Sequence, residues 1–169
     1  MRLRCGRVDR GHEDCLLAIP SLPSVIVVME NERKVNVPVV KRFVRKVVGC
    51  TCSDEVFKQV GVKAGSSAIK SCAADYEINV GGRLLIVLSS EPAEGFSPAR
   101  LEKVMAEGRS ARDAGKFNRF RFILQADNPP EAEKKLLRLI EGIATKDEKT
   151  HLHVIGKADV PDFFEGGGR

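Results

Sequence analysis

The sequence contains no long hydrophobic run. Its longest apolar runs, such as residues 25–29, have the length of a strand, far below the roughly 18 residues that a membrane-spanning helix needs. Residues 1–4 are basic, but Asp9, Glu13 and Asp14 follow, and no apolar stretch with a small-residue cleavage site comes next. We therefore expect neither a membrane span nor a secretory signal.

Cysteines are few and follow no regular framework. The five of them are an odd number without the spacing of a small secreted fold, so we expect free thiols in a reducing compartment. The only groups of soft metal ligands are Cys50-x-Cys52 and His151-x-His153, and neither has a second pair at zinc-site spacing. Two histidines on one strand face can bind an ion, but two exposed histidines are the commoner case. The sequence predicts no metal and no cofactor.

Motifs for phosphate loops and nucleophiles are missing too. The run Gly61-x-x-x-Gly65-Ser66-Ser67 lacks the lysine of a Walker loop, and Gly81-Gly82 precedes a strand where a dinucleotide fingerprint must follow one. The sequence has no Gly-x-Ser-x-Gly elbow and no convincing Ser/His or Cys/His pairing. A covalent nucleophile therefore has no candidate.

One acidic cluster does allow an enzymatic hypothesis. Glu30, Glu32 and Lys34 follow the apolar run at 24–29. Metal-dependent phosphodiesterases hold Mg²⁺ with clustered carboxylates, beside a lysine that steadies the attacking water. A solvated turn explains the same residues equally well. A nuclease that uses Glu30, Glu32 and Lys34 is therefore an alternative.

The chain does contain enough apolar sequence for one folded domain. It has 169 residues, of which 43% are apolar and 30% are charged. This length and composition suit one hydrophobic core with tails. We expect a flexible basic tail at 1–14, an α/β domain at 15–164 and a disordered tail at 165–169.

The order of predicted elements indicates the fold class. Apolar runs of strand length alternate with two capped helical patterns that begin at Ser97 and Pro129. This βαβαβ order predicts a three-layer α/β domain with a mostly parallel sheet between helices. A hairpin with a Gly81-Gly82 turn precedes it, and a loop is expected over 61–74. The expected strands are 24–29, 75–80, 83–88, 120–124 and 152–155.

Positive charge is concentrated in residues 32–46. The formal net charge is +5, and this segment supplies six bases against one acid. Pro38, apolar residues at helical spacing and a final Gly49 predict a helix, although its many valines leave a twisted strand open. A basic stripe suits a nucleic-acid backbone, whereas a solvated helix face is the alternative. The candidate contacts are Lys41, Arg42, Arg45 and Lys46.

A second basic group alternates with aromatic residues. Arg119 and Arg121 interleave with Phe120 and Phe122, so a ring could stack on a base while the cations hold phosphates. The alternative is an edge strand with one buried aromatic face. Arg119 and Arg121 are further candidate nucleic-acid contacts.

The two later helices are expected to serve both the core and a partner chain. Leu101, Val104 and Met105 should point inward, with Arg109, Arg112 and Lys116 outward. The second helix carries a wide apolar stripe formed by Leu136, Leu137, Leu139, Ile140 and Ile143. The predicted partner contacts are Leu101, Met105, Leu136 and Ile140.

Several segments together carry a family resemblance. They read Ser-Val-Ile-Val-Val at 24–28, Val-Pro-Val-Val-Lys-Arg-Phe-Val-Arg-Lys-Val at 37–47, Asp-Tyr at 75–76, Leu-Leu-Ile-Val-Leu-Ser at 84–89 and Phe-Ser-Pro-Ala-Arg-Leu at 96–101. A strand–helix–strand pattern over 120–155 follows them. In these segments the chain resembles the central domain of the non-catalytic partner subunit of XPF-type structure-specific endonucleases, a family of excision-repair and meiotic crossover partners.

The resemblance implies an XPF-type nuclease-like fold without its active site. In the active subunit a Glu-Arg-Lys motif ends the central strand, whereas the matching place here is Leu88-Ser89-Ser90. Glu32-Arg33-Lys34 belongs to an earlier strand. The chain is then not an enzyme. The resemblance makes residues 41–46 a strand, against the helix that their spacing predicts.

The resemblance also implies partners. It predicts a subunit that binds single-stranded or junction DNA and pairs with an XPF-like protein in DNA repair or meiotic recombination, in the nucleus. Nothing after Phe164 matches the helix-hairpin-helix motifs of the repair subunit, and residues 50–74 match nothing in the family. A small RNA-binding α/β module, with Arg119 and Arg121 as contacts, is the remaining alternative.

Overall fold

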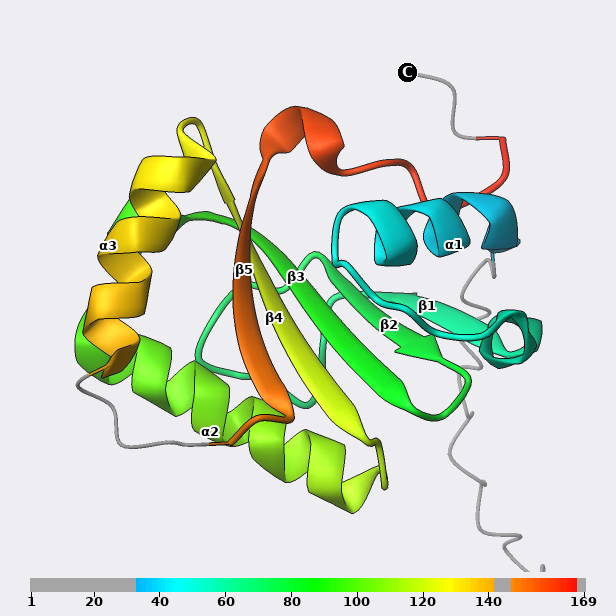
Figure 1. Cartoon of the computed structure of the whole chain (residues 1–169), viewed down its shortest axis with the longest axis horizontal. Helices are drawn as coiled ribbons and strands as arrows, with labels where there is room; N and C mark the ends of the chain where they lie inside the picture. Colours follow the sequence, from blue (N-terminus) through cyan, green and yellow to red (C-terminus); the bar gives the residue numbers. More distant parts are fainter. Residues whose placement is uncertain (1–32, 142–146, 167–169) are drawn as a thin grey trace, which may run out of the picture. The chain divides into compact units, whose positions relative to one another are not determined.

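The computed structural model describes residues 33–141 and 147–166. The expected strand at 24–29, the carboxylates of Glu30 and Glu32 and the tail at 1–14 lie outside these residues. The described chain forms an α/β domain with one five-stranded sheet in the order β1-β2-β3-β4-β5 (Figure 1). None of the described helices is both long and apolar enough to span a membrane.

The sheet is mixed rather than mostly parallel. Strand β1 (Val60–Ala64) pairs antiparallel with β2 (Tyr76–Val80), which pairs antiparallel with β3 (Leu84–Pro92). Strands β4 (Arg119–Ala126) and β5 (Thr150–Gly156) continue the sheet in parallel. The prediction of a mostly parallel sheet is therefore wrong for one half, because short connections join antiparallel strands whereas parallel strands need a crossover.

The predicted hairpin at Gly81-Gly82 is confirmed. Both glycines have positive φ, 63° and 62°, as the tight turn between β2 and β3 requires. Gly81 also lies against Val56, where a Cβ atom would collide with the 3-10 helix η1 (Asp54–Lys58). The turn therefore fixes the position of η1 at the end of the hairpin.

Strand β1 differs from the predicted loop over 61–74. Its central residue, Val62, pairs with Ile78 at the edge of the sheet. The segment is too short and too rich in small residues to show a strand pattern by itself, so the partner strand decides its structure. Residues between β1 and β2 contain no described helix or strand.

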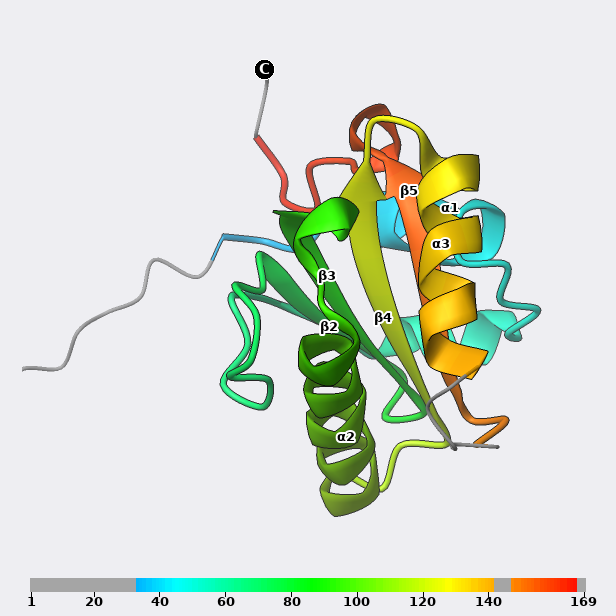
Figure 2. The same cartoon turned by 90° about the vertical axis from the view of Figure 1, so that its left-hand side faces the viewer.

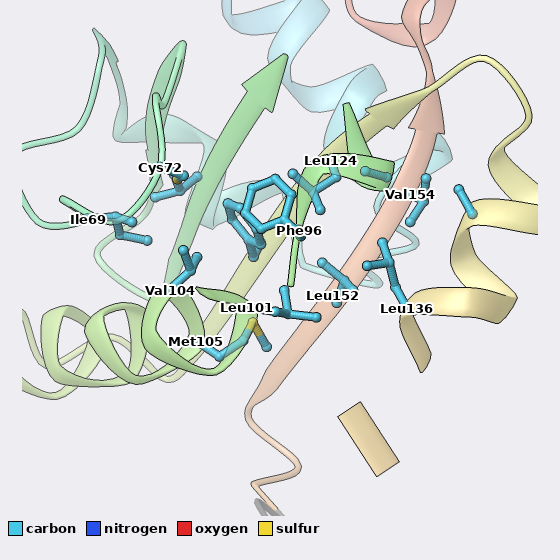
Figure 3. Close-up of a cluster of buried hydrophobic side chains, with 14 of the residues drawn as sticks. Ile69, Cys72, Phe96, Leu101, Val104, Met105, Leu124, Leu136, Leu152 and Val154 are labelled. Carbon is cyan, nitrogen blue, oxygen red and sulfur yellow. The ribbon is translucent and has the colours of Figure 1, made fainter. Parts of the chain in front are cut away.

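Two helices cover one face of the sheet. Helix α2 (Pro98–Ala114) begins at Ser97, whose Oγ accepts a hydrogen bond from the Arg100 backbone N–H at 3.2 Å. Helix α3 (Pro129–Glu141) follows β4, and short 3-10 helices η2 (Ala93–Gly95) and η3 (Lys157–Asp159) flank β3 and β5. Buried side chains of α2 and α3 meet those of β3, β4 and β5 (Figure 3).

Helix α1 (Val37–Lys46) covers the opposite face, which makes the domain three-layered. Figure 2 shows α2 and α3 in front of the sheet and α1 behind it. The side chain of Asn36 caps α1 at the Val39 N–H, and Val40, Phe43 and Val44 are buried against the sheet. The helix predicted from residue spacing is therefore confirmed, and the strand implied by the resemblance for 41–46 is wrong.

The predicted partner contacts lie in the core. The exposed fractions of Leu101, Met105 and Leu136 are 0%, 5% and 1%, so these side chains present no surface to another chain. The side chain of Ile140 lies outside the described part. Leu137, predicted to face the core, is 45% exposed, and no other large hydrophobic side chain of the described residues is as exposed. The periodicity of α3 directs Ala132 and Leu136 inward and Leu137 away.

Arg112 was expected on the outer face of α2 but is buried. Its guanidinium forms ion pairs with Asp113 and with Asp147 just before β5, and it donates a hydrogen bond to Thr150 Oγ1 at 2.9 Å. Burial disfavours its charge, but these partners raise its pKa. The paired charge therefore joins α2 to the start of β5.

Strand β4 lies inside the sheet rather than at an edge. It pairs with β3 on one side and β5 on the other, and Phe120 and Phe122 are completely buried. These rings therefore cannot stack on nucleic-acid bases, and the alternative is right about the buried aromatic face but wrong about the edge position. The neighbouring arginines, Arg119 and Arg121, are the parts of this segment that reach the surface.

Candidate nucleic-acid interface

Arg119 and Arg121 lie on the α1 face of the sheet. Residues two apart on a strand share a face, and Ile123, the next residue of this series, is buried beneath α1. Arg119 is exposed and Arg121 is half-buried. Both predicted groups of nucleic-acid contacts, on α1 and on β4, therefore belong to the same side of the domain.

A pocket of about 250 Å³ surrounds these two arginines at the amino-terminal end of β4. Three guanidinium groups, one amide and two hydroxyl groups line it, and none of its described lining residues is acidic. The polar lining consists of Arg83, Arg119, Arg121, Asn118, Thr51 and Ser53. The rest of the wall consists of Gly49, Cys50, Cys52, Val56, Val80 and Leu84. We call this site the arginine pocket.

Backbone hydrogen bonds hold the polar lining together. The carbonyl oxygen of Arg83 accepts from the N–H groups of both Asn118 and Arg119, at 2.8 and 3.1 Å. Arg83 follows the glycine turn, and its own N–H donates to the Val80 carbonyl at 3.1 Å. The hairpin turn and the start of β4 thus form one hydrogen-bonded unit that brings the three arginines to the same pocket.

Arg121 carries an unsatisfied charge in this pocket. Its Nη1 atom is buried and has no hydrogen-bond partner among the described residues. Burial, and then the positive charge of Arg119, lower its pKa. A half-buried guanidinium that has no anion beside it among the described residues is unfavourable, so the pocket favours a negatively charged ligand.

Two histidines of β5 follow the same face as Arg121. Burial, and then the charges of Arg121 and His151, lower the pKa of His153 to about 4, so this imidazole is neutral at pH 7. The Nε2 atom of His151 lies 2.7 Å from the Glu148 carbonyl oxygen. Among the described residues, no three His, Cys, Asp or Glu side chains come together as a metal site. His153 therefore adds no charge to the surface at neutral pH.

The four cations of α1 fall into two pairs. Lys41 and Arg45 both form ion pairs with Asp54, whose pKa is lowered by hydrogen bonds from these two side chains. Arg42 and Lys46 are exposed and form no ion pair within the described part of the chain. One carboxylate therefore engages two of the four cations, and Arg42 and Lys46 keep the charge that a phosphate can use.

Cys50 and Cys52 are joined by a disulfide in the wall of the arginine pocket. The expectation that all cysteines are free thiols is therefore wrong for this pair. Their separation of two residues matches neither a zinc site nor a secreted framework, and so no pattern indicated that they pair. Cys72 is free and buried, and burial, followed by the Glu91 charge, raises its pKa to about 11.

The carboxyl end of β3, where the resemblance places a lost active site, is occupied by internal hydrogen bonds. Ser89 is buried and donates from Oγ to the Ala73 carbonyl at 2.7 Å. Asp75 accepts from the Oγ and N–H groups of Ser90, and Glu91 pairs with Arg100. Asp75 and Glu91 are therefore engaged within the fold.

Lys34, the lysine of the alternative nuclease cluster, pairs with Glu165 at 2.9 Å. Both groups are exposed, with side-chain exposed fractions of 79% and 46%. Because Glu30 and Glu32 lie outside the described residues, the positions of their carboxylates relative to Lys34 and Asp75 are not described. The nuclease alternative stays a prediction from the sequence.

Four polar residues of the pocket were missed by the sequence reading: Arg83, Thr51, Ser53 and Asn118. Arg83 had a usable signal, because it directly precedes β3, the strand beside β4, and its neighbour Leu84 pairs with Arg119. Thr51 and Ser53 had none, since their segment forms no regular element. No protein-family model, no curated protein and no solved structure matches the chain.

Proposed function

We propose that this chain is a non-catalytic nucleic-acid-binding domain with an XPF-type nuclease-like fold. Its contact surface comprises the arginine pocket and the exposed cations Arg42 and Lys46 of α1. The observation that carries the proposal is the convergence of Arg83, Arg119 and Arg121 on a pocket without acidic lining. Guanidinium groups pair with phosphate through two parallel hydrogen bonds, which suits them to a sugar-phosphate backbone.

The residues at the carboxyl end of the central strand β3 favour a non-catalytic role. Metal-dependent phosphodiester cleavage needs free carboxylates around the metal. Here Asp75 bonds to Ser90 and Glu91 pairs with Arg100. These bonds favour a structural role for both acids, in accord with the serines that stand in the place of the family motif.

Pairing with an XPF-like chain belongs to the same proposal and rests on the resemblance. Because Leu101, Met105 and Leu136 are buried, the surface of α3 around Leu137 is the part of the two predicted helices that remains for a contact. Copurification of the tagged protein tests this part. An XPF-like chain that is retained by the wild type and lost in Leu137→Glu supports pairing, and a tagged protein that recovers no such chain contradicts it.

The binding proposal is tested by the salt dependence of affinity for a fluorescent single-stranded DNA. Each phosphate contact contributes about 0.7 to the slope of log affinity against log salt on a single strand. Changing Arg83, Arg119 and Arg121 together to Gln should therefore flatten the slope by about 0.7 for each phosphate that the pocket holds. The matched control changes Lys134, Lys135 and Arg138, exposed cations of α3 on the opposite face, to Gln.

The two triple variants separate site-specific binding from general attraction. Equal losses in both would mean that net charge alone attracts the DNA, which contradicts the arginine pocket as the contact. The same samples are incubated with Mg²⁺ or Mn²⁺ and flap, bubble and single-stranded substrates. Cleavage that disappears in Glu32→Gln would overturn the non-catalytic proposal. Stronger binding to RNA of the same sequence would favour the RNA-binding alternative.

A further inference from the structure

The arginine pocket has more positive charge than a passing backbone phosphate requires. Arg83, Arg119 and Arg121 all line it, and the Nη1 atom of Arg121 is buried without a partner among the described residues. Arg119 and Arg121 are like charges on one strand face, and the charge of Arg119 disfavours that of Arg121. A site that holds like charges this close is completed by a ligand that neutralises several of them.

The carboxylate nearest along the chain is already engaged. Asp54 follows Ser53 of the pocket wall, but Lys41 and Arg45 bind it from α1. Arg45 also donates to the Cys52 carbonyl at 3.0 Å, which holds this part of the wall in place. Glu55, the next carboxylate, lines an adjoining pocket with Arg83 but pairs with Lys58 at 2.6 Å. Both carboxylates of this segment therefore already have cationic partners.

We propose that the arginine pocket binds the terminal phosphate of a nucleic-acid strand. A terminal phosphomonoester carries a charge of about −1.5 to −2 at pH 7 and has three strong acceptor oxygens, whereas an internal phosphodiester carries one charge. The dianion is the better match for three guanidinium groups. Thr51, Ser53 and Asn118 supply neutral donors, and Val56, Val80 and Leu84 give the wall an apolar part for the carbon atoms of the sugar.

This inference rests on the proposed function and makes it more specific, since it assigns the pocket to strand ends and leaves Arg42 and Lys46 on α1 for internal phosphates. Strand β4 is paired on both sides and is therefore a rigid element, which fixes the position of the Arg121 backbone beside the pocket. A ligand then completes a site that the sheet has already arranged.

The experiment compares one DNA oligonucleotide in three forms: 5′-phosphorylated, 3′-phosphorylated and unphosphorylated. One phosphorylated form should bind at least about tenfold more tightly than the unphosphorylated form, the effect of a single charge-assisted hydrogen bond. Arg121→Gln should remove this preference, and Arg119→Gln provides the same test should the first variant fail to fold. Arg138→Gln, an exposed arginine of α3, should keep the preference.

The outcomes distinguish the inference from the function on which it rests. Equal affinity for all three oligonucleotides overturns the strand-end site but leaves nucleic-acid binding intact. No binding to any of them overturns the proposed function itself. A nucleoside monophosphate is tested as the second source of the same group, and if it binds as tightly as the phosphorylated oligonucleotide, the strand-end proposal is wrong.

Discussion

Arg45 of α1 donates a hydrogen bond to the carbonyl oxygen of Cys52 at 3.0 Å, and its guanidinium also pairs with Asp54. The last turn of the basic helix is therefore attached to the loop that forms one wall of the arginine pocket. In addition, the Cys50 N–H donates to the Val44 carbonyl at 3.0 Å. The two basic groups predicted from the sequence are thus parts of one surface.

The ion pairs of Asp54 should limit nucleic-acid binding. Asp54→Asn removes the carboxylate that engages Lys41 and Arg45, so both cations become available to phosphates. We expect tighter binding to single-stranded DNA and a salt slope steeper by up to about 1.4 units. Fluorescence anisotropy across a salt series measures both.

The matched control for this variant is Glu94→Gln, which removes one exposed negative charge at the other end of the sheet. A gain in affinity of the same size in Glu94→Gln and Asp54→Asn would show that only net charge matters. The account predicts a clearly smaller gain for the control.

The sequence predicted best where a local pattern decides the structure. The helices at Pro38, Ser97 and Pro129 and the hairpin at Gly81-Gly82 follow from caps, spacing and glycines, and all are present. Strand β1 and the interior position of β4 depend on which strands pair across the sheet, which no local pattern contains. For the same reason the sequence pattern indicated Arg119 and Arg121 as candidate nucleic-acid contacts but not Arg83.

Burial was harder to predict than secondary structure. Arg112 has the charge and spacing of a surface residue, and only the position of Asp147 makes its burial favourable. From the sequence, Leu101, Met105 and Leu136 were expected to be more apolar residues than one core face could bury. In the structure all three are buried between the sheet and the two helices. How much apolar helix surface a sheet can bury depends on the assembled fold, which the pattern of a single helix does not contain.

Gly108 should not tolerate a side chain. It lies in the middle of α2 directly over the ring of Phe120, and a Cβ atom there would overlap that ring. Although alanine favours helices over glycine, we expect Gly108→Ala to lower the free energy of unfolding by about 1–3 kcal/mol through overpacking. Urea denaturation measures the change.

The control for this substitution is Ser110→Ala on the exposed face of the same helix. Because it changes helix propensity without a new contact, it should alter stability by less than about 0.5 kcal/mol. Equal stability of Gly108→Ala and the wild type would contradict the close packing of α2 on β4.

His153 should make the domain less stable in weak acid. Its folded pKa of about 4 lies below the ordinary value of 6.5 because of burial, Arg121 and His151. The unfolded state therefore binds more protons between these values, so the free energy of unfolding falls as pH drops from 6.5 towards 4. The fall amounts to at most about 3 kcal/mol.

Denaturation at several pH values tests this linkage. His153→Gln should lose less stability than the wild type between pH 6.5 and 4, while His151→Gln serves as the control with a nearby exposed histidine. Below this pH range, protonation of Asp147 lowers the free energy of unfolding further. Burial opposes its charge, but bonds from Arg112 and Thr150 lower its pKa to about 2, so its contribution is lost as pH falls from 3.8 towards 2. An unchanged profile in His153→Gln would contradict a buried neutral imidazole.

The disulfide between Cys50 and Cys52 can be checked in one tryptic peptide. Cleavage after Lys46 and Lys58 releases residues 47–58, which contain both cysteines. When the protein is alkylated before any reductant is added, we expect this peptide to be unalkylated and lighter by two hydrogen masses than its dithiol form. Full alkylation of both thiols would contradict the disulfide.

The most direct measurement of the central claim is a titration of the ¹⁵N-labelled protein with a single-stranded oligonucleotide phosphorylated at both its 5′ and its 3′ end, followed by NMR. The account predicts that the largest shift changes occur at the backbone amides of residues 49–53 and at Arg83, Asn118, Arg119 and Arg121, the residues that line the arginine pocket. Changes confined to α2 and α3, on the other face of the sheet, would contradict it.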